Sequence, residues 1–116
     1  MAIERFDQVT AYLNEAAVHD GVVYLAGLTA DDLSADIRGQ TEQTLAAIDR
    51  VLAQTGSDKS KLLRVEIWLS DMAEFEAMNS AYEAWVDPSN VPPRVCVESR
   101  LWDTAAKVEI MVTAVR

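Results

Sequence analysis

The chain has 116 residues, of which half are hydrophobic and a quarter are charged, with four Gly and three Pro. This composition is typical of a globular protein and excludes a disordered one. Nineteen acidic residues against ten basic ones give a formal net charge of -9, which disfavours nucleic acid as a partner. Non-specific binding to nucleic acid depends on basic side chains that neutralise phosphates. The length fits one domain, residues 1–116.

The chain has a single cysteine, Cys96, so it cannot form an internal disulfide or a multi-cysteine metal site. A reducing compartment is expected. The N-terminal residues include acids where a signal peptide carries a basic and then an apolar stretch, and no run of about 18 apolar residues occurs. We therefore expect a cytoplasmic protein that does not associate with a membrane.

Two strands and a helix are predicted in the first half of the chain. Residues 2–12 alternate roughly between polar and apolar, and residues 22–26 form a β-branched apolar run set off by the turn pair Asp20-Gly21. A helix follows from about Asp36, a candidate N-cap, to Thr55-Gly56. Its apolar face has the three- and four-residue spacing of Ile37, Thr41, Leu45, Ile48, Val51 and Leu52.

The second half predicts a strand at residues 62–69, a helix capped by Asp71, and two further strands at residues 94–101 and 107–115. The second helix ends at Asp87-Pro88 and has an apolar face of Met72, Phe75, Met78, Tyr82 and Trp85 or Val86. The predicted order is β-β-α-β-α-β-β, with an antiparallel C-terminal strand pair. This is an α+β fold in which both helices cover one face of a mixed sheet. Apolar residues on the other face would favour oligomerisation.

The sequence lacks the motifs of common nucleotide-binding sites, serine hydrolases and zinc sites. It contains no Gly-x-Gly-x-x-Gly, no Walker loop, no Gly-x-Ser-x-Gly and no paired Cys or His spacing. We therefore expect neither a metal nor an organic cofactor. The only histidine, His19, precedes the Asp20-Gly21 turn, and it is assigned no role.

Arg94 and Glu109 are the candidate catalytic residues. Arg94 follows Pro92-Pro93, which restrict the backbone and can hold the guanidinium in place to bind a carboxylate with its planar fork of donors. The alternative is a surface salt bridge. Glu109 lies in an apolar stretch and shares a strand face with Met111 and Thr113, where burial would raise its pKa and suit proton transfer to and from water. The alternative is an edge or interface acid paired with Arg or Lys.

Cys96 and Asn79 are weaker candidates. Cys96 shares a strand face with Arg94, but no histidine is adjacent in sequence, so a buried inert thiol is the default interpretation. Asn79 interrupts the second helix beside its apolar face, either as a satisfied polar contact or as a hydrogen-bonding residue of a pocket.

The run Pro92-Pro-Arg94-Val-Cys96-Val-Glu98-Ser-Arg-Leu101, followed by Val108-Glu109-Ile110, resembles the C-terminal signature of the RidA/YjgF family of reactive-intermediate deaminases. Residues 21–27, 40–45 and 68–79 are similar to their family counterparts as well. The resemblance implies a chorismate-mutase-like subunit that assembles as a homotrimer, with ligand pockets at the subunit interfaces.

The resemblance also implies an activity. The deaminases of the family hydrolyse small carboxylated enamines or imines, such as 2-aminoacrylate, to a 2-keto acid and ammonia without a cofactor. By this match Arg94 grips the substrate carboxylate, the backbone near Cys96 contacts the substrate, Glu109 positions water, and Asn79 belongs to the pocket. These roles fit the chemistry, because an arginine that holds the substrate carboxylate fixes the reacting carbon beside the water that a glutamate can deprotonate.

The N-terminal half departs from the deaminase pattern. Leu13-Asn14 stands where the family often has Tyr-Ser or Tyr-Val, and Ala26-Gly27-Leu28 replaces Ser-Gly-Gln. The loss of polar pocket residues indicates a divergent subgroup. It also leaves open a non-catalytic trimer that binds 2-keto acids, which requires Arg94 but not Glu109. The ribonuclease or translation-inhibitor activity attached to some family names is disfavoured by the charge of -9.

Overall fold

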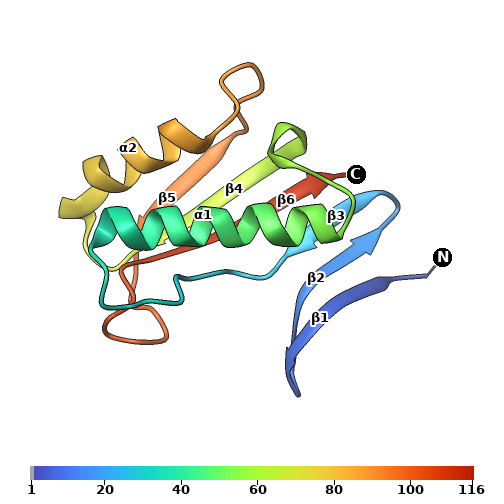
Figure 1. Cartoon of the computed structure of the whole chain (residues 1–116), viewed down its shortest axis with the longest axis horizontal. Helices are drawn as coiled ribbons and strands as arrows, with labels where there is room; N and C mark the ends of the chain where they lie inside the picture. Colours follow the sequence, from blue (N-terminus) through green and yellow to red (C-terminus); the bar gives the residue numbers. More distant parts are fainter. Residues whose placement is uncertain (1) are drawn as a thin grey trace.

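A computed structural model describes residues 2–116 as one six-stranded sheet with both α-helices on the same face (Figure 1). The strands are β1 (Glu4–Thr10), β2 (Leu13–His19), β3 (Val22–Leu25), β4 (Leu62–Leu69), β5 (Arg94–Glu98) and β6 (Val108–Val115). The helices are α1 (Ile37–Gln54) and α2 (Phe75–Trp85), with 3-10 turns η1 (Lys59–Lys61) and η2 (Met72–Glu74). The predicted α+β fold with a mixed sheet is confirmed.

The strand order in the sheet is β1-β2-β3-β6-β4-β5, and only β4 and β5 run parallel. Two expectations were wrong. The chain before Asp20 forms two strands instead of one, because it reverses at Ala11-Tyr12 without a Gly or Pro signal. The C-terminal strands do not pair, because the connection through α2 places β5 parallel to β4, and β6 then inserts between β4 and β3.

The predicted turn and helix caps are present. Asp20 and Gly21 have φ of 53° and 77°, the positive values that a type I′ turn requires between β2 and β3. The Asp36 carboxylate accepts a hydrogen bond from the Gly39 backbone N–H at 2.8 Å and so caps α1. Asp71 accepts from the Ala73 N–H at 2.9 Å, although it caps η2, which then leads into α2 at Phe75.

The core lies between the sheet and the two helices. Alternate residues of the central strands are fully buried beneath the helices: Val65, Ile67 and Leu69 of β4, and Val108, Ile110 and Val112 of β6. They pack against apolar residues of the helices: Leu45, Ile48, Leu52, Met78 and Tyr82. Burial of such side chains stabilises the fold by about 1.5–3 kcal/mol each.

The opposite face of the sheet, here called the open face, carries the other residues of the same alternation. They include Tyr24 of β3, Val95 and Val97 of β5, and Glu109 and Met111 of β6. Tyr24, Val95 and Val97 are 50%, 48% and 42% exposed, respectively. The helices leave this apolar surface uncovered.

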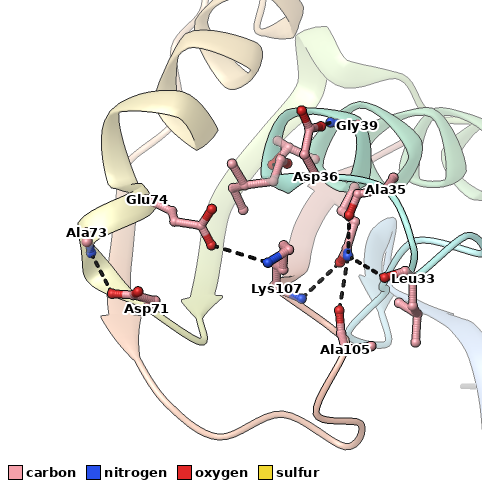
Figure 2. A network of polar contacts seen from close by, with 12 residues as sticks. Leu33, Ala35, Asp36, Gly39, Asp71, Ala73, Glu74, Ala105 and Lys107 are labelled. Carbon is pink, nitrogen blue, oxygen red and sulfur yellow. Dashed lines mark hydrogen bonds and ion pairs between the residues drawn. The ribbon is translucent and has the colours of Figure 1, made fainter.

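Gln40 of α1 joins three separate parts of the fold through its buried side chain. Its amide nitrogen donates to the carbonyl oxygens of Leu33, Ala35 and Ala105 at 3.0–3.1 Å, and its amide oxygen accepts from the Lys107 N–H at 2.9 Å (Figure 2). A Lys107–Glu74 ion pair at 3.8 Å lies beside this network. The loop before α1 and the loop before β6 are therefore held by one side chain.

Candidate active site

Arg94 lies at the start of β5 on the face covered by the helices. Its guanidinium donates to Asn79 Oδ1 of α2 at 2.6 Å, and Asn79 in turn donates to the Glu83 carboxylate at 2.9 Å. The guanidinium carbon lies 4.7 Å from the centre of the Tyr82 ring and 5.7 Å from that of Phe75, which are cation–π distances. The rings and the amide therefore fix the position of the charge.

Arg94 forms no ion pair with any carboxylate among residues 2–116. The surface salt bridge considered from the sequence is therefore not formed within this chain. A half-buried guanidinium that lacks a carboxylate partner retains donors for an external anion, and Arg presents them in a geometry that matches a carboxylate.

Cys96 lies two residues further along β5 on the same face as Arg94, as the alternation predicts. Its side chain is half-buried and packs against the core. Burial raises the pKa of the thiol, and the nearby Arg94 charge offsets only part of this effect. A neutral thiol is a poor nucleophile, so the side chain is better explained by packing.

Glu109 lies on the open face of β6, opposite Trp68 of β4, and shares that face with Met111 and Thr113 as predicted. It makes no ion pair with the described basic residues, and burial raises the pKa of its carboxyl group. The carboxylate lies directly against Gly27. A Cβ atom at Gly27 would overlap Oε2 of Glu109 and lie 3.0 Å from its Cδ, so only glycine leaves this position open.

A cavity of about 520 Å³ lies beside Glu109. Its walls come from the β1–β2 hairpin, the segment that follows β3, the loop after β5, and β6 itself: Val9, Thr10, Tyr12, Leu13, Glu15, Ala26, Gly27, Leu28, Thr29, Trp102 and Glu109. A volume of this size fits a small-molecule ligand. The predicted pocket residues Leu13 and Ala26 therefore do line one cavity with Glu109.

The predicted site residues thus form two groups. Leu13, Ala26 and Glu109 surround the cavity, whereas Arg94 and Asn79 lie together under α2. The strand registers place these groups on opposite faces of the sheet, since Arg94 pairs with Val65 of the buried face and Glu109 pairs with Trp68 of the open face. Arg94 and Glu109 are therefore not brought together within one chain.

Sequence reasoning missed the cavity residues Trp102, Tyr12 and Thr29. Trp102 is 70% exposed in the loop after β5, where its indole N–H donates to the Thr29 hydroxyl at 3.3 Å. Tyr12 is 88% exposed at the tip of the unpredicted hairpin. A large aromatic residue at an exposed loop position was the only available signal, because these residues follow no helical or strand periodicity.

The described residues meet neither the requirements of a metal-binding cluster nor those of a membrane-spanning helix. No three His, Cys, Asp or Glu side chains of residues 2–116 gather in a way that would hold a metal ion. In the same residues, neither helix has the length and apolar character needed to cross a bilayer.

The sequence matches the family model described as endoribonuclease L-PSP over residues 2–116. A "RutC family protein" of Haemophilus ducreyi is 43% identical over 112 residues, which cover 97% of this chain and 95% of that protein. The crystal structure of NMB1025 from Neisseria meningitidis, titled a member of the YjgF protein family, superposes with a TM-score of 0.96 at 39% identity. The superposition covers 100% of this chain and 96% of the NMB1025 chain.

A more distant relative, named "Reactive Intermediate Deaminase A, chloroplastic", comes from Arabidopsis thaliana. It is 30% identical over 97 residues, which cover 84% of this chain and 51% of that protein. The chain therefore belongs to the RidA/YjgF family, as the C-terminal signature around Arg94 predicts.

Proposed function

We propose that the protein hydrolyses small carboxylated imines and enamines, such as 2-aminoacrylate, to 2-keto acids and ammonia. The observation that carries the proposal is the pair of incomplete half-sites. One half holds an Arg94 guanidinium without a carboxylate partner, and the other holds a Glu109 carboxylate without a basic partner beside a ligand-sized cavity. Each half supplies the charge that the other lacks.

The complete site would form between two chains of a homotrimer. In a cyclic trimer each interface is heterologous, so one surface of a chain contacts a different surface of its neighbour. This arrangement can set the Arg94 edge of one subunit against the Glu109 cavity of the next. The exposed apolar residues of the open face, Tyr24, Val95 and Val97, favour such assembly because they would be covered.

The chemistry follows from these two charges. Arg94 binds the substrate carboxylate in a bidentate manner and holds the C=N carbon beside Glu109. Glu109, whose pKa is raised by burial, accepts a proton from water as the water oxygen bonds to that carbon, and passes the same proton to the imine nitrogen to give a neutral carbinolamine. The hydroxyl proton of the carbinolamine then passes by way of Glu109 to the nitrogen as the C–N bond breaks, so that ammonia leaves and the ketone remains.

The name of the Arabidopsis relative supports a deaminase activity, whereas the family name endoribonuclease finds no support in the charge of this chain. A net charge of -9 predicts weak and salt-sensitive contact with RNA. Deaminase activity is therefore the better assignment of the two.

One observation favours a second candidate, a trimer that binds 2-keto acids without turnover. The positions matching polar pocket residues of the family are Leu13, Ala26 and Leu28, and all three line the cavity. Binding of this kind requires Arg94 alone. Replacement of Glu109 by Gln would separate the two functions, because turnover would be lost in an enzyme while carboxylate binding would remain.

The test generates imines in situ with an amino-acid oxidase and follows the release of ammonia and keto acid with and without the protein. Acceleration by the wild type that is lost in Arg94→Ala supports the proposal. The matched control is Arg38→Ala, because Arg38 is a half-exposed arginine of α1 engaged with Glu42. If the wild type accelerates no imine, the deaminase assignment is overturned and the carboxylate-binding trimer becomes the better account.

A further inference from the structure

We infer that the cavity selects imines that carry a branched aliphatic or aromatic side chain over the three-carbon 2-aminoacrylate and over acidic imines. This inference rests on the proposed function, and it concerns the substrate class of the same site. The evidence is the chemistry of the cavity wall, which contains residues that the family resemblance did not single out.

The wall is largely apolar. Val9 and Leu13 come from the β1–β2 hairpin, Leu28 follows β3, and Trp102 closes the side formed by the loop after β5. Ala26 and Gly27 keep the wall near Glu109 free of bulk. At about 520 Å³ the cavity is larger than a single methyl group needs, so a small substrate would leave most of this apolar surface in contact with water.

Some of the polar groups of the cavity already have partners or a role in the reaction. Glu15 pairs with Arg50 of α1 at 3.5 Å, and the Thr29 hydroxyl accepts from the Trp102 indole N–H at 3.3 Å. Glu109 is reserved for the water and the imine nitrogen in the proposed reaction. A hydroxyl or amide on the substrate side chain would have only the hydroxyls of Thr10, Tyr12 and Thr29 as further side-chain partners, and it would be buried at a cost if it stayed unpaired.

The charge of the cavity excludes a second carboxylate on the substrate. The wall contains two carboxyl groups, those of Glu15 and Glu109, and no Lys or Arg lines it. A carboxylate on the side chain would meet the Glu109 carboxylate, which has no basic partner among the described residues, and this repulsion costs binding free energy. Imines derived from aspartate or glutamate should therefore be rejected.

The substrate orientation follows from the positions of the two charges. The α-carboxylate is held by Arg94 outside the cavity, and the reacting carbon must lie next to Glu109, which contacts Gly27. The side chain then extends from the reacting carbon into the cavity that Glu109 lines. Each additional methylene placed in an apolar pocket changes kcat/KM by roughly 10- to 200-fold.

The experiment measures kcat/KM for imines made in situ from leucine, phenylalanine, alanine and glutamate. Alanine gives 2-iminopropanoate, the tautomer of 2-aminoacrylate. We expect the leucine- and phenylalanine-derived imines to exceed the alanine-derived imine by at least about 10-fold, with the glutamate-derived imine slowest. Trp102→Ala should reduce the leucine-to-alanine ratio severalfold. Ile3→Ala, which changes a half-exposed apolar residue outside the cavity, should leave that ratio unchanged.

A second measurement separates the specificity from the reaction. Isothermal titration compares the binding of 4-methyl-2-oxopentanoate with that of pyruvate, and it requires no turnover. Tighter binding of the branched keto acid supports the inference even if no imine is hydrolysed, in which case the proposed reaction alone is overturned. Equal or weaker binding of the branched acid, or a kcat/KM that is highest for the alanine- or glutamate-derived imine, overturns the inference and leaves the deaminase intact.

Discussion

Arg94 and Glu109 project from opposite faces of the same sheet, on strands β5 and β6 that are separated by β4. Arg94 is aligned with Val65 beneath the helices, and Glu109 is aligned with Trp68 on the open face. Side chains on opposite faces of a sheet cannot both contact one small molecule. If both act on one substrate, two chains must contribute to each site.

This relationship predicts complementation between inactive variants. Arg94→Ala and Glu109→Gln chains should each lack activity. If the site forms between chains as proposed, assemblies formed from an equal mixture should contain some interfaces with an intact Arg94 from one chain and an intact Glu109 from the next. With random mixing, about one quarter of the interfaces carry both intact residues, so about one quarter of the wild-type activity is expected. The assay is imine hydrolysis after the two purified variants are denatured together and refolded.

The control for complementation is the same mixture without the denaturation step, in which subunits exchange only as fast as the assembled protein dissociates. The two residues would be shown not to share a site across chains if the co-refolded mixture had no activity while a separate wild-type sample, denatured and refolded in the same way, was active.

The raised pKa of Glu109 predicts a specific pH dependence of stability. Since burial disfavours the charged carboxylate, the folded protein holds this proton more tightly than the unfolded chain, whose carboxyl group titrates near the ordinary value of 4.5. The stabilising contribution is therefore present below that pH and is lost as the pH rises through the higher folded pKa. The Tm of Glu109→Gln should rise relative to wild type between pH 4 and pH 7.

The reference for this comparison is Glu76→Gln, which changes an exposed acid of α2. Its Tm relative to wild type should vary little over the same range. A Glu109→Gln difference that stays constant or moves in the opposite direction would contradict a carboxyl group whose pKa is raised by burial.

Gly27→Ala should reduce activity much more than stability. The new methyl group would overlap Glu109 Oε2, and the flexible carboxylate can rotate away at a small cost in the free energy of unfolding. Misplacing a catalytic group by about 1 Å can lower the rate roughly 100-fold. We expect a large fall in kcat with a Tm change of only a few degrees, measured by imine hydrolysis and thermal unfolding. A variant with full activity would show that this position of Glu109 is not needed.

Gln40→Ala should destabilise the fold, because four backbone groups of two loops would lose their partner. Leaving buried polar groups unsatisfied costs about 1–3 kcal/mol each, so a loss of at least about 2 kcal/mol in the free energy of unfolding is expected in urea. Gln43→Ala is the matched control. Its side chain accepts one peripheral hydrogen bond from the Asp32 N–H, so the loss should be below about 1 kcal/mol. Equal losses in the two variants would contradict the linking role of Gln40.

Much of the fold could be predicted because its signals are local. The spacing from Ile37 to Leu52 and the cap at Asp36 describe α1 correctly, and the Asp20-Gly21 pair describes the β2–β3 turn. The reversal at Ala11-Tyr12 carries no comparable local signal. The insertion of β6 between β3 and β4 is a non-local choice that strand periodicity does not encode.

The site shows the same division between local and non-local information. Alternation along β5 and β6 correctly groups Arg94 with Cys96 and Glu109 with Met111, but it cannot tell which of these faces lies under the helices. The contribution of Trp102 depends on where a loop packs. The nearness of Gly27 to Glu109 depends on the approach of two segments that are distant in sequence.

The β1–β2 hairpin gives the cavity its outer wall, yet β1 bonds to the sheet only through β2, and none of its residues is fully buried. Such an edge can open locally at a small fraction of the free energy of global unfolding. The wall can therefore swing outward to admit side chains of different sizes while the core under α1 stays closed. Occupancy of the cavity would then be recorded as slower amide hydrogen exchange along β1, whose residues Val9 and Thr10 line the same cavity as Glu109.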